Sequence, residues 1–198
     1  SGAGVAFKLA AALDGCTPDE MLPFYGDLAA IGTIADIMLL EGENRRIVKA
    51  GLALLQQTER PGIAALIEAC GLGGKELTAE NVSFGLAPRL NAAGRMDSAA
   101  AALELLLCED PEEAEAIVAG LEAQNAARQK AEQDILQGVL DSVAADENYG
   151  ADRILVVWGR GYHQGVIGIV ASRVVERFGK PAIIVSVDEN GEGKGSGR

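Results

Sequence analysis

The chain has 198 residues, which is enough for one or two domains with their own hydrophobic cores. Its net charge of −12 excludes a non-specific coat on nucleic acid, so any binding of phosphate must come from a local basic patch. Hydrophobic residues make up 48% of the chain and aromatic residues only 4%, which favours aliphatic helical packing over a sheet of exposed aromatics that stacks RNA bases.

The cysteines and the single histidine limit the chemistry further. Cys16, Cys70 and Cys108 are widely separated, form no C-x-x-C pair and are accompanied only by His163. This pattern is typical of a reducing compartment and excludes a self-contained zinc site. The longest apolar runs are too short to span a bilayer, and the first residues lack the basic leader of a signal peptide. We therefore expect a soluble cytoplasmic protein.

The first third of the chain predicts only helices. Residues 4–13 are apolar on most sides and begin without a capping sequence, which suggests a buried helix in a chain that is cut upstream. Residues 27–40 predict a second apolar helix or a strand-to-helix segment, in which Asp36 has apolar neighbours on both sides. Amphipathic helices are predicted over 43–57 and 61–70, and a proline opens the second of these.

The middle of the chain contains the clearest helix boundaries. A loop is predicted over 71–74, followed by a helix over 79–86 that Thr78 caps. Further helices are predicted from Ser98 to Leu107 and from residue 110 to about residue 143. The sequence DPEE gives the last helix a cap, a proline at its first position and acids near its positive end. This long helix is interpreted as a bridge between two lobes with a solvated face.

The segment PRLNAAGRMD, residues 88–97, has the composition of an anion site. Arg89 and Arg95 are six residues apart and cannot share one helix face, but a backbone break at 91–94 would let both guanidiniums point toward one oxyanion. In the alternative interpretation, the proline ends one helix, the glycine caps a turn and both arginines are solvated.

The last third of the chain changes to strand, loop, helix and strand. The predicted elements are a strand over 153–158, a helix over 167–178 that Gly179 stops, and a strand over 182–187. The short crossover predicts parallel, neighbouring strands. The loop 159–168 carries four glycines, Arg160 and His163, and it lies where a strand ends and a helix begins, which is a natural position for binding phosphate.

Alternatives remain for this part of the chain. The loop does not fit the G-x-G-x-x-G pattern, although Asp188 lies near the position of a ribose-binding acid, so a nucleotide-cofactor enzyme is a distant alternative. His163 has the alternative role of capping the helix or bonding a backbone carbonyl. The final residues 191–198, GEGKGSGR, predict either a flexible tail or a second glycine-rich anion loop.

Taken together, the motifs resemble the RecJ family of single-strand-specific exonucleases in the DHH phosphoesterase superfamily. The resemblance covers essentially the whole chain, and PRLNAAGR and HxGVIGIVASR are its most specific parts. In chain order the motifs are GVAFKL at 4–9, AIGTIAD at 30–36 followed by ENR at 43–45, PRLNAAGR at 88–95, HQGVIGIVAS at 163–172 and GSGR at 195–198.

The resemblance implies an α/β fold in three parts. These are the helical C-terminal part of a DHH domain over 1–109, a connector helix over 110–148, and the start of an α/β DHH-associated, substrate-binding domain with a parallel βαβ unit over 149–198. The aspartate pair and the Asp-His-His element of the superfamily are absent and would lie before Ser1. The closing glycine-rich histidine motif would lie after Arg198. The resemblance therefore implies an internal fragment that is not a nuclease by itself.

The implied activity is metal-dependent removal of nucleotides from the 5′ end of single-stranded DNA, in repair and recombination. Family members hold two Mn²⁺ or Mg²⁺ ions, and Asp36 matches the last metal-binding aspartate, with Asp27 as the fallback. A carboxylate is a suitable ligand for either ion. Arg89, Asn91 and Arg95 match catalytic residues near the scissile phosphate, where fixed donors stabilise developing charge.

The remaining site residues lie in the second domain. His163 matches the histidine of the DHH-associated domain, and Ser196 and Arg198 match the GSGR element, which we assign with Arg160 to binding the DNA backbone or the terminal 5′ phosphate. We expect a monomer that binds no membrane. The rival functions are another DHH phosphoesterase, acting on short oligonucleotides or cyclic dinucleotides, and a non-catalytic scaffold that has kept the fold and lost the metals.

Overall fold

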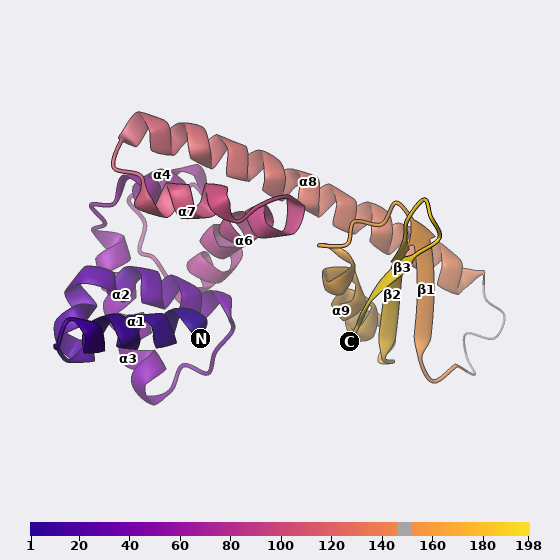
Figure 1. The fold of residues 1–198 in the computed structure, drawn as a ribbon, viewed down its shortest axis with the longest axis horizontal. Helices are drawn as coiled ribbons and strands as arrows, with labels where there is room; N and C mark the ends of the chain where they lie inside the picture. Colours follow the sequence, from indigo (N-terminus) through magenta and orange to yellow (C-terminus); the bar gives the residue numbers. More distant parts are fainter. Residues whose placement is uncertain (146–151) are drawn as a thin grey trace. The chain divides into compact units, whose positions relative to one another are not determined.

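The computed structural model describes residues 1–145 and 152–198, and it is mostly helical with one small mixed sheet (Figure 1). The chain divides into two compact units, Ser1–Ala123 and Gln124–Arg198. The helices are α1 (Gly2–Leu13), α2 (Pro18–Ala35), α3 (Gly42–Gln56), α4 (Pro61–Ala69), α5 (Ala79–Asn81), the π-helix η1 (Val82–Leu86), α6 (Ala87–Met96), α7 (Ala100–Leu107), α8 (Pro111–Ala144) and α9 (Ile167–Phe178). The strands are β1 (Leu155–Arg160), β2 (Ala182–Val187) and β3 (Gly193–Gly197).

This architecture confirms the predicted α/β class, with a long helix between a helical part and a parallel βαβ unit. The predicted domain limits of 1–109, 110–148 and 149–198 remain predictions, and the limit at 148/149 lies outside the described residues. Within residues 1–145 and 152–198, no helix is long and apolar enough to cross a membrane.

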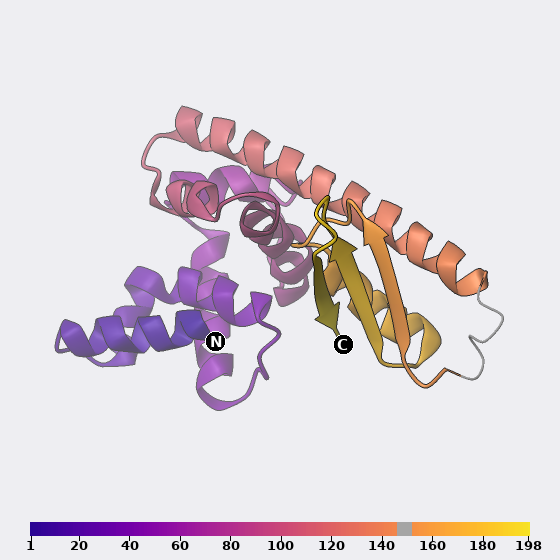
Figure 2. The same cartoon turned by 45° about the vertical axis from the view of Figure 1, so that its right-hand side comes forward.

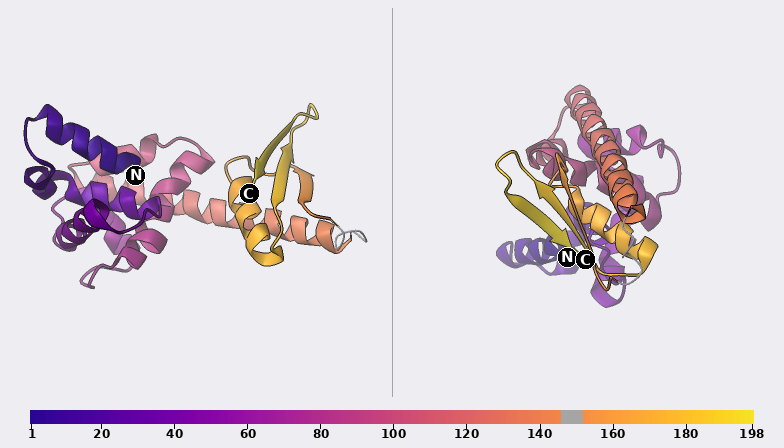
Figure 3. Two further views of the ribbon diagram at one scale, coloured as in Figure 1. Left: turned by 90° about the horizontal axis from the view of Figure 1, so that it is seen from below. Right: turned by 90° about the vertical axis from the view of Figure 1, so that its right-hand side faces the viewer.

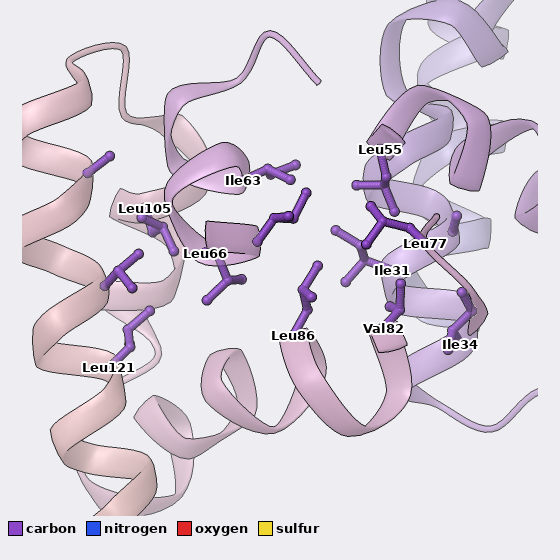
Figure 4. Packing of buried hydrophobic residues seen from close by; sticks show 14 of the residues in the cluster. Ile31, Ile34, Leu55, Ile63, Leu66, Leu77, Val82, Leu86, Leu105 and Leu121 are labelled. Atoms are coloured by element: carbon purple, nitrogen blue, oxygen red, sulfur yellow. The ribbon is translucent and has the colours of Figure 1, made fainter. Parts of the chain in front are cut away.

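The first unit is built around one cluster of aliphatic side chains. The ten side chains labelled in Figure 4 come from six helices and the loop before α5, and they meet in a single core. They are Ile31, Ile34, Leu55, Ile63, Leu66, Leu77, Val82, Leu86, Leu105 and Leu121. Burial of each such side chain contributes about 1.5–3 kcal/mol, so this core is the main source of stability for the unit.

Glycines let two pairs of helices in this unit approach closely. A methyl group on Gly62 of α4 would lie 1.8 Å from the carbonyl oxygen of Leu105 in α7. A methyl group on Gly51 of α3 would lie 2.3 Å from the carbonyl oxygen of Gly26 in α2. Because the obstructing atoms belong to the backbone of a packed helix, neither position has room for a side chain.

We expect Gly62→Ala to lower the free energy of unfolding by about 2 kcal/mol, because α4 and α7 must separate to admit the methyl group. The matched control is Gly120→Ala in the same unit. Gly120 has open space around it in α8, so its replacement is expected to stabilise the helix by about 1 kcal/mol. Thermal unfolding of the two variants checks both signs, and equal melting temperatures would contradict the packing argument.

Helix α1 begins two residues earlier than predicted and is less buried. The hydroxyl of Ser1 accepts a hydrogen bond of 3.0 Å from the backbone N–H of Gly4, so the helix has a cap, contrary to the prediction. Within the described residues, only Phe7 and Ala11 of this helix are buried, while Leu9 is 58% exposed. The prediction of a helix buried on most sides was therefore wrong for the structure described.

Helix α2 differs from the predicted segment 27–40 at both ends. It begins at Pro18 because Thr17 and Glu20 form a capping box, in which each side chain accepts a hydrogen bond from the other residue's backbone N–H. It ends at Ala35 because Ile37 adopts a positive φ of 53°. Asp36 is consequently the C-cap of α2, and it is exposed to solvent.

The segment from residue 78 to residue 96 corrects two predictions. Thr78 caps α5 as predicted, with its hydroxyl accepting from the backbone N–H of Asn81. However, the helical path continues through η1 and α6, so the predicted end at Pro88 and the predicted break at 91–94 are both wrong. The wider turn of η1 immediately precedes Pro88 and makes room for a ring that an ordinary α-helical turn would exclude.

The remaining helices of the first half agree with the sequence. Those predicted over 43–57 and 61–70 correspond to α3 and α4 within one residue at each end, and the loop over 71–74 is present. The helix predicted from Ser98 corresponds to α7, and α8 begins where Asp110 accepts a hydrogen bond of 2.9 Å from the backbone N–H of Glu113.

The sheet of the second unit has the strand order β1-β2-β3 (Figures 2 and 3). Strands β1 and β2 are parallel, as predicted, and α9 is the crossover helix between them. This helix ends at Phe178, and its C-cap Gly179 has a φ of 64°, a left-handed conformation that glycine adopts without strain. Strand β1 begins and ends two residues later than predicted, so it includes Arg160.

The end of the chain forms a strand, so the prediction of a flexible tail or a glycine-rich anion loop is wrong. Residues 193–197 form β3, which pairs antiparallel with β2 so that Ser196 lies opposite Ile184. The glycines of β3 lack side chains on one sheet face, and a methyl group on Gly195 would meet Val185 of β2 at 3.3 Å. The sequence GKGSG has little β propensity of its own, so the strand depends on pairing with β2.

Candidate phosphate-binding and metal-binding residues

The first turn of α9 is the most promising site for an anion. The carbonyl oxygen of His163 accepts hydrogen bonds from the backbone N–H groups of Val166 (2.9 Å) and Ile167 (3.1 Å), which turns the chain into the helix. Val166 is the N-cap, and within the described residues its side chain makes no capping hydrogen bond. The N–H groups of Ile167 and Ile169 already donate to the carbonyls of His163 and Val166, so the positive end of the helix dipole is the feature of this turn that attracts an anion.

The GSGR element lies against this turn. A methyl group on Gly168 would come within 3.1 Å of both the Ser196 hydroxyl oxygen and Nη2 of Arg198. The guanidinium of Arg198 is held by donating to Ser196 Oγ at 3.2 Å and to the carbonyl of Gly197 at 2.8 Å. The structure therefore brings together two motifs almost thirty residues apart, and it places a hydroxyl and a cation beside a helix N-terminus.

Gly168 is a residue whose role the sequence did not reveal. It lies in the first turn of α9, and the lack of a side chain there leaves the space that Ser196 and Arg198 enter. A glycine destabilises a helix by about 1 kcal/mol relative to alanine. Its presence inside a predicted helix was therefore the one signal in the sequence that this position has a special role.

His163 is oriented by its own loop. Its Nδ1 accepts a hydrogen bond of 3.2 Å from the backbone N–H of Gly165. The ring therefore bonds a backbone amide, not a carbonyl as the alternative proposed. In a neutral ring whose Nδ1 accepts, the proton is on Nε2, which is then available to donate to an anion.

The structure does not bring Arg160 together with Ser196 and Arg198. Along β1, Leu155 and Val157 are buried on one face, while Val156 and Trp158 are exposed on the other. Arg160 shares the face of Val156 and Trp158, because alternate residues of a strand point to opposite sides. Ser196 lies on the other face, since it pairs with the buried Ile184.

In the first unit, the guanidinium of Arg89 is bound by a backbone carbonyl and by a carboxylate. Its Nη1 donates to the carbonyl of Gly85 at 2.9 Å, and its Nη2 lies 3.2 Å from Oε1 of Glu122 in α8. The sequence did not predict Glu122 as a partner, because 33 residues separate the two side chains. Cys70 lies near this ion pair, and burial raises the pKa of its thiol.

Asn91 and Arg95 lie on a different face of α6 from Arg89. They are four residues apart in a continuous helix, so they are neighbours, and both are exposed. Arg89 is six residues from Arg95, which places the two side chains about 120° apart around the helix. The expected convergence of both guanidiniums through a backbone break is therefore not what the structure shows.

The two candidate metal ligands of the first unit differ sharply. Asp27 is 6% exposed, and its Oδ2 accepts a hydrogen bond of 2.8 Å from Nε of Arg60. Its Oδ1 accepts from the backbone N–H of Leu28, also at 2.8 Å, so both carboxylate oxygens are engaged. Asp36 is exposed at the end of α2, and its carboxylate is the one open to solvent.

A carboxylate oxygen is a ligand that Mn²⁺ and Mg²⁺ accept, so Asp36 fits as one ligand of such an ion. Among residues 1–145 and 152–198, no three His, Cys, Asp or Glu side chains are grouped closely enough to hold a metal ion. The described residues therefore supply one ligand and not a complete metal site.

Comparison with known proteins gives a consistent result. The chain is 46% identical over 200 residues to the single-stranded-DNA-specific exonuclease RecJ of Bacillus subtilis, and 35% identical over 215 residues to RecJ of Escherichia coli. Both matches cover 100% of this chain but only 25% and 37% of the relatives. The chain thus spans between a quarter and a little over a third of the length of these curated relatives. No protein-family model matches the chain.

Solved structures agree in fold. The crystal structure of RecJ from Thermus thermophilus in complex with Mn²⁺ superposes with a TM-score of 0.78 at 40% sequence identity. The match covers 93% of this chain and 26% of that one. A structure of the same enzyme with Mg²⁺ gives the same TM-score. The chain therefore belongs to the RecJ family and corresponds to part of its relatives' length.

Proposed function

We propose that this chain is part of a metal-dependent exonuclease that removes nucleotides from the 5′ end of single-stranded DNA. The observation that carries the proposal is the meeting of Ser196 and Arg198 with the first turn of α9. The chain matches proteins named single-stranded-DNA-specific exonuclease over its whole length, which supports the same substrate class.

The residues of the second unit bind phosphate in this proposal. The Ser196 hydroxyl and the Arg198 guanidinium donate to the oxygens of a backbone or 5′-terminal phosphate, and the positive end of the α9 dipole adds to the attraction. Nε2 of His163 supplies one further donor from the loop before the helix. Because the chain carries a net charge of −12, such local donors must provide the attraction for DNA.

The first unit contributes Asp36 and the exposed face of α6. Asp36 would hold one of two Mn²⁺ or Mg²⁺ ions, and the RecJ structures with these ions support that choice. Bound in a pair, such ions activate water and stabilise the charge that develops at the phosphate. Asn91 and Arg95 are neighbouring donors that stabilise the same charge. Arg89 positions α6 through Glu122 in our proposal and does not bind phosphate directly.

The wider role follows from this activity. We propose that the full-length protein acts as a cytoplasmic monomer in DNA repair and recombination. The parts of the relatives that this chain does not match supply the remaining metal ligands, so the 198-residue chain alone is expected to release no nucleotides.

The test is digestion of single-stranded DNA by the full-length protein in Mn²⁺, with the label at either the 5′ or the 3′ end. We expect immediate release of a 5′ label, late release of a 3′ label and no digestion of duplex DNA. Preferential digestion of short oligonucleotides or cyclic dinucleotides would support a different phosphoesterase. A complete absence of hydrolysis would support a non-catalytic scaffold.

Replacing Arg198 by alanine tests the phosphate site separately. We expect Arg198→Ala to weaken binding of single-stranded DNA and to reduce the slope of log affinity against log salt by about 1, because one phosphate contact is lost. Arg177→Ala is the matched control, since Arg177 is an exposed arginine in the last turn of α9. Fluorescence anisotropy over a salt series provides the measurement. An equal change in slope for the two variants would refute a specific site at Arg198.

A further inference from the structure

Ile37 has a backbone conformation that its residue type disfavours. Its φ is 53°, and among the described residues it is the one non-glycine residue with a positive φ. In the left-handed region the Cβ atom comes too close to the following carbonyl oxygen, and a β-branched side chain makes this conformation a genuine outlier. Glycine is the usual residue where a helix ends in this way.

The strain lies directly after Asp36, the proposed metal ligand. The backbone N–H of Asp36 donates to Gly32 at 3.1 Å and continues the helix, while the N–H of Ile37 donates to Ile34 at 3.0 Å. The N–H of Met38 then donates back to Thr33 at 3.3 Å. These bonds close the helix end around a left-handed residue, so the conformation of Ile37 determines where the chain leaves Asp36.

A second contact holds the chain beyond this turn. Nδ2 of Asn44, in the first turn of α3, donates to the carbonyl oxygen of Leu39 at 3.0 Å. The segment between α2 and α3 is therefore fixed at both of its ends.

Packing of the isoleucine side chain does not account for the strain. Ile37 is 87% exposed, so its burial within the described residues stabilises the turn very little. A glycine would adopt the same φ without strain, but it would also allow the peptide after Asp36 many other conformations. Unfavourable backbone geometry of this kind is often found where a functional group must be held in place.

We propose that Ile37 is a positioning residue that restricts the backbone at Asp36 and so keeps its carboxylate oriented toward a divalent cation. This inference rests on the proposed function, because it needs Asp36 to be a metal ligand. The turn made by Ile37 fixes the peptide that follows the ligand, and Asn44 fixes the chain beyond it. Ile37 touches neither the metal nor the substrate in this role.

The test compares Ile37→Gly and Ile37→Val in the full-length protein, using Mn²⁺ alone as the probe and electron paramagnetic resonance to count bound ions. We expect Ile37→Gly to bind Mn²⁺ about 10-fold more weakly, as is typical when a residue that orients a ligand is lost. Its melting temperature should not fall, because the glycine relieves strain. Ile37→Val keeps a β-branched residue and should retain the original Mn²⁺ affinity.

Each outcome separates this inference from the proposed function. Original Mn²⁺ affinity in Ile37→Gly, together with weakened affinity in Asp36→Ala, would overturn the role of Ile37 and leave Asp36 as a ligand. If Asp36→Ala kept the original Mn²⁺ affinity, Asp36 would not be a metal ligand, and the positioning role of Ile37 would be overturned as well. A lower melting temperature in Ile37→Gly would mean that the side chain packs against another part of the protein, and this would also overturn the inference.

Discussion

Replacing Glu132 by alanine is expected to destabilise the packing of α9 on α8 by about 3 kcal/mol, because it leaves an uncompensated charge in a buried place. Glu132 is 3% exposed, and its Oε2 accepts a hydrogen bond of 2.8 Å from Nη1 of Arg128. Its other oxygen forms an ion pair with Nε of Arg173 in α9. Arg173 is about half-exposed, so we expect the lower end of the range for broken buried pairs.

Most of the expected destabilisation in this variant comes from the buried charge of Arg128. Its side chain is only 13% exposed, and after the loss of Glu132 it retains hydrogen bonds to Oδ1 of Asn125 at 3.1 and 3.3 Å. An amide oxygen does not neutralise a guanidinium, so the charge remains buried without a counterion. The substitution Glu132→Gln keeps the shape and removes the charge, and it should cost less than alanine.

Hydrogen exchange of the full-length protein measures this effect locally. A loss of 3 kcal/mol corresponds to exchange about 100-fold faster in the amides of α9. Glu176→Ala is the control, because Glu176 is an exposed acid in the same helix. Since α9 holds the proposed phosphate site at its first turn, binding of single-stranded DNA should weaken together with this protection. Equal exchange in the Glu132 and Glu176 variants would show that the buried pair does not hold α9 in place.

The sequence predicted α9 and β2 well because their signals are local. The apolar periodicity of α9 ends at Gly179, which stops the helix, and the aliphatic run at residues 182–185 of β2 is typical of a buried strand. A short crossover between two such strands leaves parallel pairing as the expected topology. For these elements, local propensity and tertiary structure favour the same conformation.

Prediction failed where tertiary contacts decide the structure. The residues of β3 are mostly glycine, and their strand conformation comes from pairing with β2. The helical path through Pro88 depends on the π-helix η1, which no local pattern of the sequence indicated. The end of α2 depends on Ile37, whose residue type argues against the left-handed conformation that it adopts.

The candidate site was predicted only in part. Ser196 and Arg198 were assigned through their resemblance to a motif, and the structure explains their assignment through Gly168. The pairing of Arg89 with Glu122 depends on α6 packing beside α8, which spacing along the chain does not reveal. Arg160 lies on the opposite sheet face from Ser196 because side chains alternate along β1, while Ser196 pairs with the buried Ile184.

Replacing Asp36 by alanine is expected to reduce Mn²⁺-dependent digestion by about 100-fold, because a ligand of a two-metal site is lost from the reaction centre. The fold should be unaffected, since Asp36 is exposed and only its backbone N–H bonds to the helix. Asp14→Ala is a closely matched control. Asp14 is also an exposed aspartate at the end of a helix in the same unit. Its φ of −79° is close to the −81° of Asp36.

The most direct measurement is therefore the Mn²⁺-dependent rate of nucleotide release from 5′-labelled single-stranded DNA by the full-length protein and by its Asp36→Ala and Asp14→Ala variants. The proposed function predicts rapid release by the original protein and by Asp14→Ala, and a loss of release in Asp36→Ala that extra Mn²⁺ restores only in part. Undiminished release in Asp36→Ala, or no release by the original protein, would contradict it.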